Sequence, residues 1–268
     1  MYKRQDDSWV TQGPNFGSGN VVRILPPKIA IAWDAPTSSY SAGNTRFLLE
    51  RQFGYPVSAI RVDTLRRADL RRYDVLILPE QGFGSYKAAL GNGGAENLKD
   101  WVNRGGVLIS LGSATRYMAD PDIDMLSIRR EERVGAKENG EEEKSATVTG
   151  QVIESAEGYD ALIQKESVRP DNVLGVLANA RVDEDHWMGA GVARQIHPLV
   201  SGRDIYTPLS LSEGVNVARF ESAESLRASG FLWDESAKQL AFKPYAVAQR
   251  HGRGYMIGFT SSPTTRAY

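Results

Sequence analysis

A serine that follows an apolar strand is the first candidate for chemistry in this chain of 268 residues. Residues 107–111 are mostly apolar, and Gly112, Ser113 and Ala114 come directly after them. A strand that turns sharply into a helix presents a nucleophile in some α/β enzymes and leaves backbone N–H groups for an anion in others. The full Gly-x-Ser-x-Gly pattern is not present, because no residue separates Gly112 from Ser113 and Thr115 replaces the second glycine. Ser113 is therefore either a nucleophile or the cap of the helix that follows.

Three further side chains could take part in acid–base chemistry. Asp34 and Glu80 each follow a predicted strand, where they could act as acid and base or simply organise a loop by hydrogen bonds. His186 lies in the sequence Asp-Glu-Asp-His-Trp and could approach Ser113 through space. The catalytic candidates are thus Ser113, Glu80 and His186, but we assign none of them a catalytic role, since helix capping and loop organisation explain the same residues.

The sequence offers no convincing metal site. The chain has three histidines, His186, His197 and His251, and their neighbours do not form the His-Glu-x-x-His or His-x-x-Glu spacing of helical zinc sites. The acidic run 183–185 beside His186 could hold a hard cation, but a solvated acidic turn is the much commoner explanation of such a run. Because there is no cysteine, disulfides, thiolate zinc sites and a cysteine nucleophile are excluded. We predict no metal and no cofactor in this chain.

Composition excludes further classes of partner. The 32 basic and 33 acidic residues give a formal net charge of −1, so no overall positive field attracts nucleic acid or an anionic membrane. No window approaches the roughly 18 apolar residues that span a bilayer, and residues 1–20 lack the apolar core of a signal peptide. We expect no nucleic-acid partner and no membrane span.

The elements that must position the candidate residues alternate between strand and helix along the first 115 residues. Apolar runs predict strands, and helical spacing of apolar residues predicts the segments between them. The predicted strands are 28–33, 58–62, 74–79 and 107–111, and the predicted helices are 42–53, 65–72 and 95–103. This alternation predicts an α/β fold with a flavodoxin-like, doubly wound, mostly parallel sheet. Ligands bind such sheets at the carboxyl ends of the strands, here the loops at Asp34, 80–84 and 112–115.

The remainder of the chain is less regular. Residues 120–144 are highly charged and predict an exposed insertion or a solvated helix. Strands are predicted at 172–178 and 216–220, and residues 245–250 and 255–260 predict a C-terminal β-hairpin at the edge of the sheet. We expect one elaborated domain over residues 28–268, with an insertion near 120–171, after a tail and linker over residues 1–27.

Five stretches of the chain together resemble one known family. They are residues 41–50, 78–82, 105–109, 185–189 and 252–259. In these stretches the chain is similar to the C-terminal domain of large bacterial zinc carboxypeptidase A-like proteins, a domain that itself resembles class I glutamine amidotransferases. The resemblance implies a flavodoxin-like fold and a periplasmic or secreted parent protein with a zinc peptidase domain upstream. Residues 2–5 resemble a translated sequencing adapter, and residues 266–268 follow a predicted strand and turn without a closing helix. We therefore expect a fragment with a partly artefactual N-terminal tail and a missing C-terminal helix.

The same resemblance bears on the site. Active amidotransferases carry a cysteine at the strand-to-helix elbow, and the matching position here is Gly112 or Ser113, so the catalytic Cys-His pair is absent. None of the zinc ligands of the peptidase can be matched to a residue of this chain. The predicted ligand-binding residues are Asp34, Glu80, Gln81, Gly82, Gly112 and Ser113. They could hold a small anion, a carboxylate or a peptide end.

These observations lead to one expected function and two alternatives. The expected function is a non-catalytic amidotransferase-like accessory domain of an exported zinc carboxypeptidase-like protein, which binds substrate or packs on the upstream peptidase domain. The alternatives are a serine hydrolase that uses Ser113, and a module that binds a small ligand, a sugar or a peptide.

Overall fold

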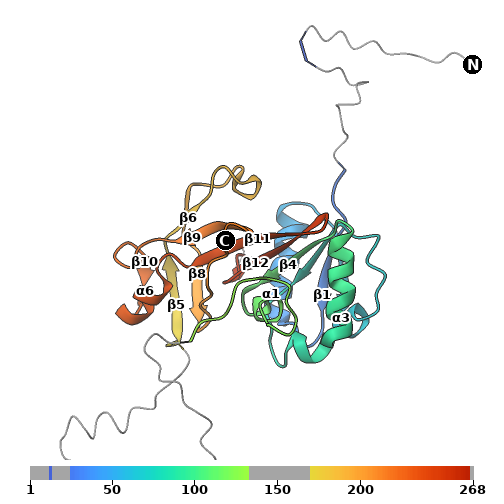
Figure 1. Cartoon of the computed structure of the whole chain (residues 1–268), viewed down its shortest axis with the longest axis horizontal. Helices are drawn as coiled ribbons and strands as arrows, with labels where there is room; N and C mark the ends of the chain where they lie inside the picture. The colour runs from blue at the N-terminus through green and yellow to red at the C-terminus, as the bar shows by residue number, and fades with distance from the viewer. Residues whose placement is uncertain (1–11, 14–24, 133–169, 266–268) are drawn as a thin grey trace, which may run out of the picture.

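A mixed nine-stranded sheet forms the centre of the molecule, as Figure 1 shows. The computed structural model describes residues 12–13, 25–132 and 170–265. The strand order is β2-β1-β3-β4-β12-β11-β9-β6-β7. The parallel half contains β2 (Val57–Arg61), β1 (Ile29–Trp33), β3 (Val75–Leu78), β4 (Val107–Leu111) and β12 (Gly254–Phe259). The antiparallel half contains β11 (Pro244–His251), β9 (Val215–Phe220), β6 (Ala180–Val182) and β7 (Gln195–Ile196).

The order of the parallel half, β2-β1-β3-β4-β12, is that of a flavodoxin-like sheet with β12 in the fifth place. The predicted fold class is therefore confirmed. Leu78 of β3 lies opposite Ser110 of β4, and Leu111 of β4 lies opposite Phe259 of β12. Because these strands are parallel, their carboxyl ends meet at one edge of the sheet. The loops after β1, β3, β4 and β12 consequently lie together.

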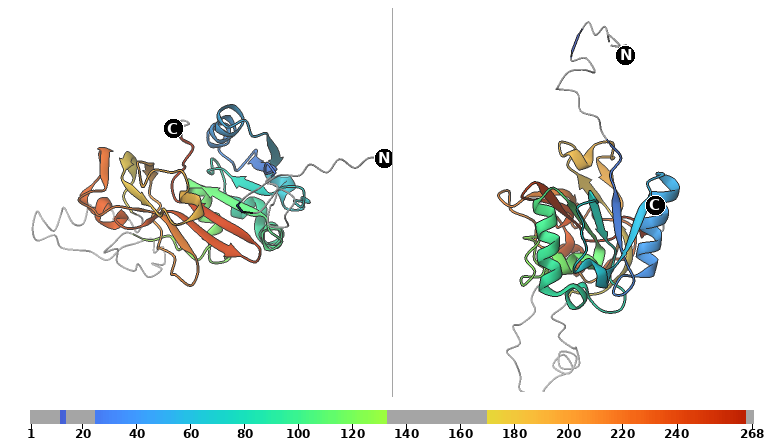
Figure 2. Two further views of the ribbon diagram at one scale, coloured as in Figure 1. Left: turned by 90° about the horizontal axis from the view of Figure 1, so that it is seen from above. Right: turned by 90° about the vertical axis from the view of Figure 1, so that its right-hand side faces the viewer.

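Helices cover both faces of the parallel half, and Figure 2 shows α1 and α3 on opposite sides of it. Side chains of β1 alternate between the two faces: Ala30 belongs to the same core cluster as Leu98 of α3, whereas Ile31 belongs to the cluster of Ala42 of α1. The helical elements are α1 (Ser39–Phe47), η1 (Leu48–Gln52), α2 (Val62–Leu65), α3 (Tyr86–Asn103), η2 (Gly112–Ala114), α4 (Thr115–Met118), η3 (Trp187–Gly189) and α6 (Asp234–Leu240).

A second, three-stranded sheet lies beside the antiparallel half (Figure 1). Its order is β10 (Arg227–Gly230), β5 (Val173–Ala178) and β8 (Leu199–Gly202), all antiparallel. Sequence analysis predicted β5 and β9 with nearly the observed bounds, but it did not predict that they belong to different sheets. Within the described residues no helix is long and apolar enough to cross a membrane.

The C-terminal hairpin exists, but the expectation that it lies at the edge of the sheet was wrong. β12 pairs with β4 on one side, and β11 pairs with β9 on the other, so the hairpin joins the two halves of the sheet. Gly254 and Gly258 on β12 allow this position, because a side chain at either would collide with neighbouring atoms. The hairpin is therefore the centre of the fold.

Several helix predictions also need correction. The predicted helix 95–103 is the second half of α3, which begins at Tyr86 and has a kink at Gly91, whose φ is 58°. The predicted helix 65–72 is replaced by the short α2 and turns. The predicted helix 42–53 begins earlier, after the cap Ser38, and passes into η1.

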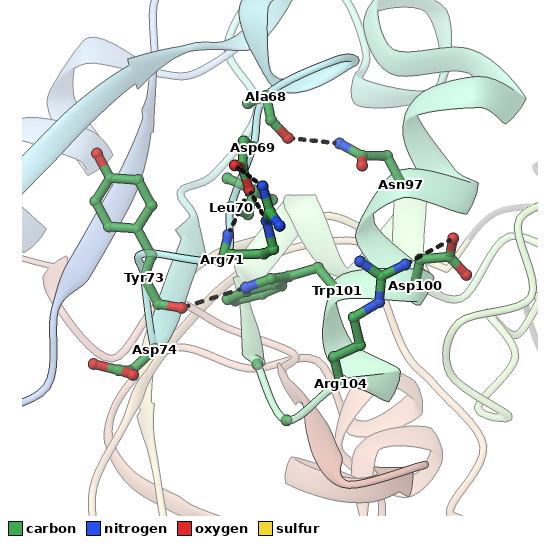
Figure 3. A pocket seen from close by; sticks show the side chains of 12 residues that line it. Ala68, Asp69, Leu70, Arg71, Tyr73, Asp74, Asn97, Asp100, Trp101 and Arg104 are labelled. Atoms are coloured by element: carbon green, nitrogen blue, oxygen red, sulfur yellow. Dashed lines mark hydrogen bonds and ion pairs between the residues drawn. The ribbon is translucent and has the colours of Figure 1, made fainter.

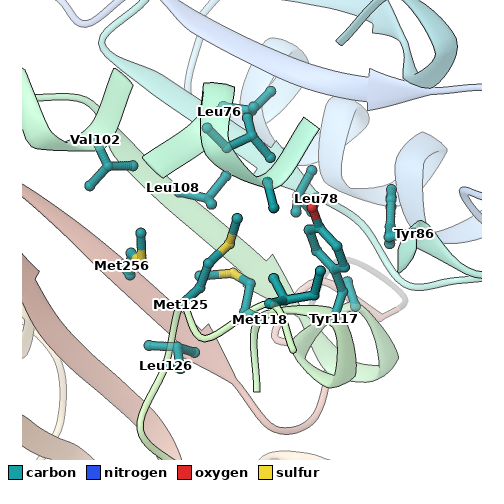
Figure 4. Packing of buried hydrophobic residues seen from close by; sticks show 14 of the residues in the cluster. Leu76, Leu78, Tyr86, Val102, Leu108, Tyr117, Met118, Met125, Leu126 and Met256 are labelled. Atoms are coloured by element: carbon teal, nitrogen blue, oxygen red, sulfur yellow. The ribbon is translucent and has the colours of Figure 1, made fainter. Parts of the chain in front are cut away.

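The first part of the charged segment packs into the core and is not a solvated face. Met125 and Leu126 are at most 2% exposed and lie against Leu108 and Met256 of the sheet, as Figure 4 shows. The charged side chains of this stretch alternate with apolar ones that reach inward. Residues 133–169, which hold most of the predicted insertion, lie outside the described residues.

Candidate functional site

The strand-to-helix elbow at the end of β4 is the centre of the candidate site. β4 ends at Leu111, and the chain turns directly into η2 and α4. Gly112 makes the turn in the left-handed region, with φ of 50°, and is buried. A Cβ atom at this position would collide with the Oε1 atom of Glu80. Glycine is therefore favoured here by the backbone conformation, and its lack of a side chain lets the Glu80 carboxyl approach closely.

Gln81 connects the elbow to the beginning of α3. Its backbone N–H donates to Ser113 Oγ at 2.9 Å, and its Nε2 donates to the Ser113 carbonyl at 2.7 Å. Its Oε1 accepts from the backbone N–H of Tyr86 at 2.8 Å. Ser113 Oγ is thus a hydrogen-bond acceptor that holds the loop after β3 against the elbow.

The loop after β1 fixes the other side of this arrangement. The Glu80 carbonyl accepts from the Ser38 N–H at 2.7 Å, and the Glu80 N–H donates to Ser41 Oγ at 3.1 Å. The Gly82 N–H donates to the Pro36 carbonyl at 2.8 Å. The backbone N–H groups of residues 80–82 are therefore all used inside the protein, and in this loop they are not available for an anion. The N–H groups at 112–114 differ, because the first N–H groups of a helical turn have no acceptor within it.

The carboxyl group of Glu80 has an unusual environment. It lies over Gly112, is half-buried, and makes no hydrogen bond to any other described residue. Burial raises the pKa of this carboxyl above its usual range, and the positive charge of Arg116 opposes the rise. Sequence analysis missed Arg116; the only signal was its place on the first turn of α4, three residues after Ser113, which keeps its charge near the elbow.

The loop after β12, next to the elbow, carries hydroxyl groups. Thr260, Ser262 and Thr264 are buried; Thr260 Oγ1 donates to the Pro244 carbonyl at 3.0 Å, and Thr264 Oγ1 lies 2.9 Å from Thr45 Oγ1. A general base for a nucleophile at the elbow would have to come from a neighbouring strand end. The described part of the loop after β12, residues 260–265, consists of threonine, serine and proline, so it offers no side chain that could act as this base.

The structure does not bring His186 to Ser113. His186 caps η3, where its Nδ1 accepts from the Met188 N–H at 3.3 Å. The ring of the next residue, Trp187, lies 5.8 Å from the ring of Tyr255. Tyr255 pairs with Val107 at the start of β4, so about 13 Å of strand separates this end of the sheet from the elbow.

Asp34 also lies apart from the elbow group. It is exposed, has φ of 66°, and its Oδ2 pairs with Arg61 Nε at 3.2 Å. Of the predicted ligand residues, the structure brings Glu80, Gln81, Gly112 and Ser113 together and places Gly82 beside them. In the parts of the chain that the structure describes, no group of three or more His, Cys, Asp or Glu side chains could hold a metal ion.

A hollow of about 380 Å³ lies at the opposite edge of the sheet, where β3 and β4 begin (Figure 3). Asp74 and Gly106 line it, together with Asp69, Arg71 and Trp101. Its polar groups satisfy one another: Arg71 pairs with Asp69 at 2.7 Å, and Trp101 Nε1 donates to the Tyr73 carbonyl at 3.3 Å. None of the predicted ligand residues reaches this hollow, and its internal pairing leaves little for a ligand to bind.

Solved structures of other proteins share the fold of this chain. No protein-family profile matches the sequence, and no curated protein matches it. A glutamine amidotransferase from Thermotoga maritima superposes over 88% of this chain and 76% of its own, with 6% identity and a TM-score of 0.51. A ThuA-like protein from Parabacteroides merdae superposes over 88% of this chain and 79% of its own, with 10% identity and a TM-score of 0.53. The chain has a glutamine amidotransferase-like fold.

A β-galactosidase from Bacillus circulans matches over 89% of this chain, with 15% identity and a TM-score of 0.48, and this chain spans 29% of its length. Identities this low establish the amidotransferase-like fold alone.

Proposed function

We propose that this chain is a non-catalytic, amidotransferase-like accessory domain that binds a ligand or packs against a neighbouring domain. One observation carries the proposal: at the elbow, the residue in the nucleophile's backbone conformation is Gly112, and the Glu80 carboxyl fills the space that a nucleophilic side chain would need. Covalent catalysis requires a nucleophile and a base within hydrogen-bond reach. At this elbow the Ser113 hydroxyl accepts a hydrogen bond from the Gln81 N–H, and no described base forms a hydrogen bond with it.

The environment of Ser113 supports the same proposal. Its Oγ accepts from the Gln81 N–H, and His186, the histidine considered as its base, lies toward the other end of β4. Glu80 is the nearest acid, and burial raises the pKa of its carboxyl, but this carboxyl forms no hydrogen bond with Ser113. A serine hydrolase that uses Ser113 is the second candidate, favoured only by the position of this residue at the elbow.

The sequence resemblance supports a more specific form of the proposal. In that form the domain belongs to a periplasmic or secreted zinc carboxypeptidase-like protein, its partner is the peptidase domain upstream, and zinc is held by that peptidase domain. The ligand would be a small anion or a peptide end at Glu80, Gln81, Gly112 and Ser113. This form rests on the five stretches that resemble the family, and it needs the sequence that precedes residue 8 as its first test.

Activity measurements with the purified chain test the proposal. We expect no hydrolysis of glutamine, of a peptide or of an activated ester above background, and no labelling by a fluorophosphonate. Ser113→Ala serves as the matched control. Turnover or stoichiometric labelling that disappears in Ser113→Ala would establish the serine hydrolase and overturn the proposal. A sugar- or peptide-binding module would instead be revealed by ligand-induced NMR shifts at residues 80–82 and 112–113.

A further inference from the structure

A second site lies beyond the elbow, in a cleft of about 470 Å³ that three arginines line. Arg116 belongs to α4, Arg130 to the segment that follows it, and Arg203 to the turn after β8. These residues are 14 and 73 positions apart along the chain, so only the tertiary fold brings them to one cavity. The volume is in the range that holds a drug-sized ligand.

Asp204 orients two of the three guanidinium groups. Its Oδ2 accepts from Arg116 Nε at 2.5 Å, and its Oδ1 lies 3.9 Å from Arg130 Nη1. The Asp204 side chain is only 13% exposed, whereas those of Arg116 and Arg130 are 45% and 49% exposed. A guanidinium has five N–H donors, so each arginine keeps donors that reach the solvent of the cleft. The shielded Asp204 carboxylate therefore holds Arg116 and Arg130 in position, while both guanidinium groups stay partly exposed.

Among the described residues that line the cleft, positive charges outnumber the negative charges that remain unpaired. Besides Asp204, the cleft is lined by Glu131 and Glu132. Lys243 Nζ pairs with Glu131 Oε1 at 2.5 Å and neutralises it. Three arginines then face two carboxylates. Arg203 is exposed and forms no ion pair with another residue in the described part of the chain.

A buried polar group next to the arginines is also unsatisfied. Tyr206 is 1% exposed, and among the described residues its hydroxyl has no hydrogen-bond partner. It is close enough to Asp204, Arg116 and Arg130 to feel their charges. Buried hydroxyls in native proteins normally have a partner. Tyr206 does not line the cleft itself, but its hydroxyl is a buried polar group without a described partner close to the arginines.

We infer that this cleft binds a small molecule through an oxyanion, either a carboxylate or a phosphate, which Arg116, Arg130 and Arg203 hold. Guanidinium groups bind both anions through paired N–H donors. The inference is independent of the proposed function at the elbow, because it requires no property of Gly112 or Ser113. Arg116 takes part in both places: it lines the cleft, and its charge acts on the Glu80 carboxyl at the elbow.

Calorimetric titration of the intact chain at low ionic strength, with inorganic phosphate and separately with succinate, tests the inference. We expect saturable binding of at least one probe. Loss of one charge-assisted contact should weaken binding by about tenfold in Arg203→Gln and in Arg130→Gln. The matched control is Arg51→Gln, which removes an exposed arginine on the other face of the sheet and should leave the affinity unchanged.

The two probes distinguish the sources of the anion. Binding of phosphate alone indicates a phosphorylated ligand, binding of succinate alone indicates a carboxylic acid, and mutual competition indicates one site for both. Each of these results supports the inference if the Arg203→Gln variant binds the same probe more weakly than the unaltered chain. The inference is overturned if neither probe binds, or if Arg203→Gln, shown to be folded by circular dichroism, binds as tightly as the unaltered chain.

Discussion

The elbow and the arginine cleft are joined by Arg116, yet they use polar groups in opposite ways. At the elbow, Gln81, Ser113 and the loop after β1 satisfy one another's hydrogen bonds, and the Glu80 carboxyl is the exception. Among the described residues, Arg203 of the cleft has no ion-pair partner, and the hydroxyl of the nearby Tyr206 has no hydrogen-bond partner. Internal pairing makes a polar region rigid, whereas unused donors are what a ligand needs. The elbow, where this fold would be expected to hold an active site, therefore leaves fewer polar groups available to a ligand than the cleft does.

The largest effect is expected from Gly112→Ala. The new Cβ atom would collide with Glu80 and would hold a non-glycine residue at φ of 50°, so we expect a loss of about 2 to 4 kcal/mol in the free energy of unfolding. Urea denaturation measures it. Gly43→Ala is the control, because Gly43 lies in α1 with open space around it.

A double variant separates the two causes. Glu80→Gly with Gly112→Ala removes the collision and leaves the backbone strain, so part of the lost stability should return. If the double variant is no more stable than the sum of the single changes predicts, the carboxyl of Glu80 does not occupy the elbow as described.

Gln81→Ala is expected to have the next largest effect. The variant lacks the side-chain hydrogen bonds to the Ser113 carbonyl and to the Tyr86 N–H. Because both backbone groups lose their partner, we expect the free energy of unfolding to fall by about 2 kcal/mol. The same denaturation experiment applies, with Gln52→Ala as the control, since Gln52 is exposed. Equal stability of the two variants would mean that the elbow does not depend on this bridge.

A pair of tyrosines tests the contrast directly. The Tyr86 hydroxyl donates to the Pro79 carbonyl at 3.0 Å and lies 2.8 Å from Thr37 Oγ1, so Tyr86→Phe should cost about 1 to 2 kcal/mol in the free energy of unfolding. Tyr206→Phe removes a hydroxyl that the described residues leave unpaired and should cost nothing measurable. A similar loss of unfolding free energy in both variants would mean that the Tyr206 hydroxyl also has a hydrogen-bond partner, and the contrast between the two regions would be wrong.

The sequence predicted the parallel half of the fold well and the antiparallel half poorly. Buried parallel strands such as β3 and β4 are short apolar runs with turns on both sides, so composition alone marks them. The first half of α3 was missed because its glycines, Gly91 among them, obscure the helical pattern. The edge position expected for the hairpin was wrong because strand order depends on contacts between β12 and β4, which are more than 140 residues apart.

The candidate site was predictable only in part, for a similar reason. Strand ends predicted that Glu80, Gln81, Gly112 and Ser113 would meet, because parallel strands end at one edge. Sequence could not predict that Gln81 would use the Ser113 hydroxyl, which depends on loop conformation. It could not predict the arginine cleft either, since Arg116 and Arg203 have no common motif and meet only through the packing of β8 against the rest of the fold.

A small, pH-dependent effect is expected from Glu80→Gln. Burial raises the pKa of this carboxyl in the folded chain above its unfolded value. The folded state therefore binds more protons than the unfolded state between these two pKa values, and the contribution of Glu80 to stability is lost as pH rises through this window. At neutral pH, Glu80→Gln should be more stable than the unaltered chain, and the difference should disappear in acid. Urea denaturation of both proteins from pH 4 to pH 8 measures it, with the exposed Glu224→Gln as the control. A Glu80→Gln variant that is less stable at neutral pH would mean that the charged carboxylate is held by the N–H groups at 112–114, and the elbow would then be an anion site already filled by the chain itself.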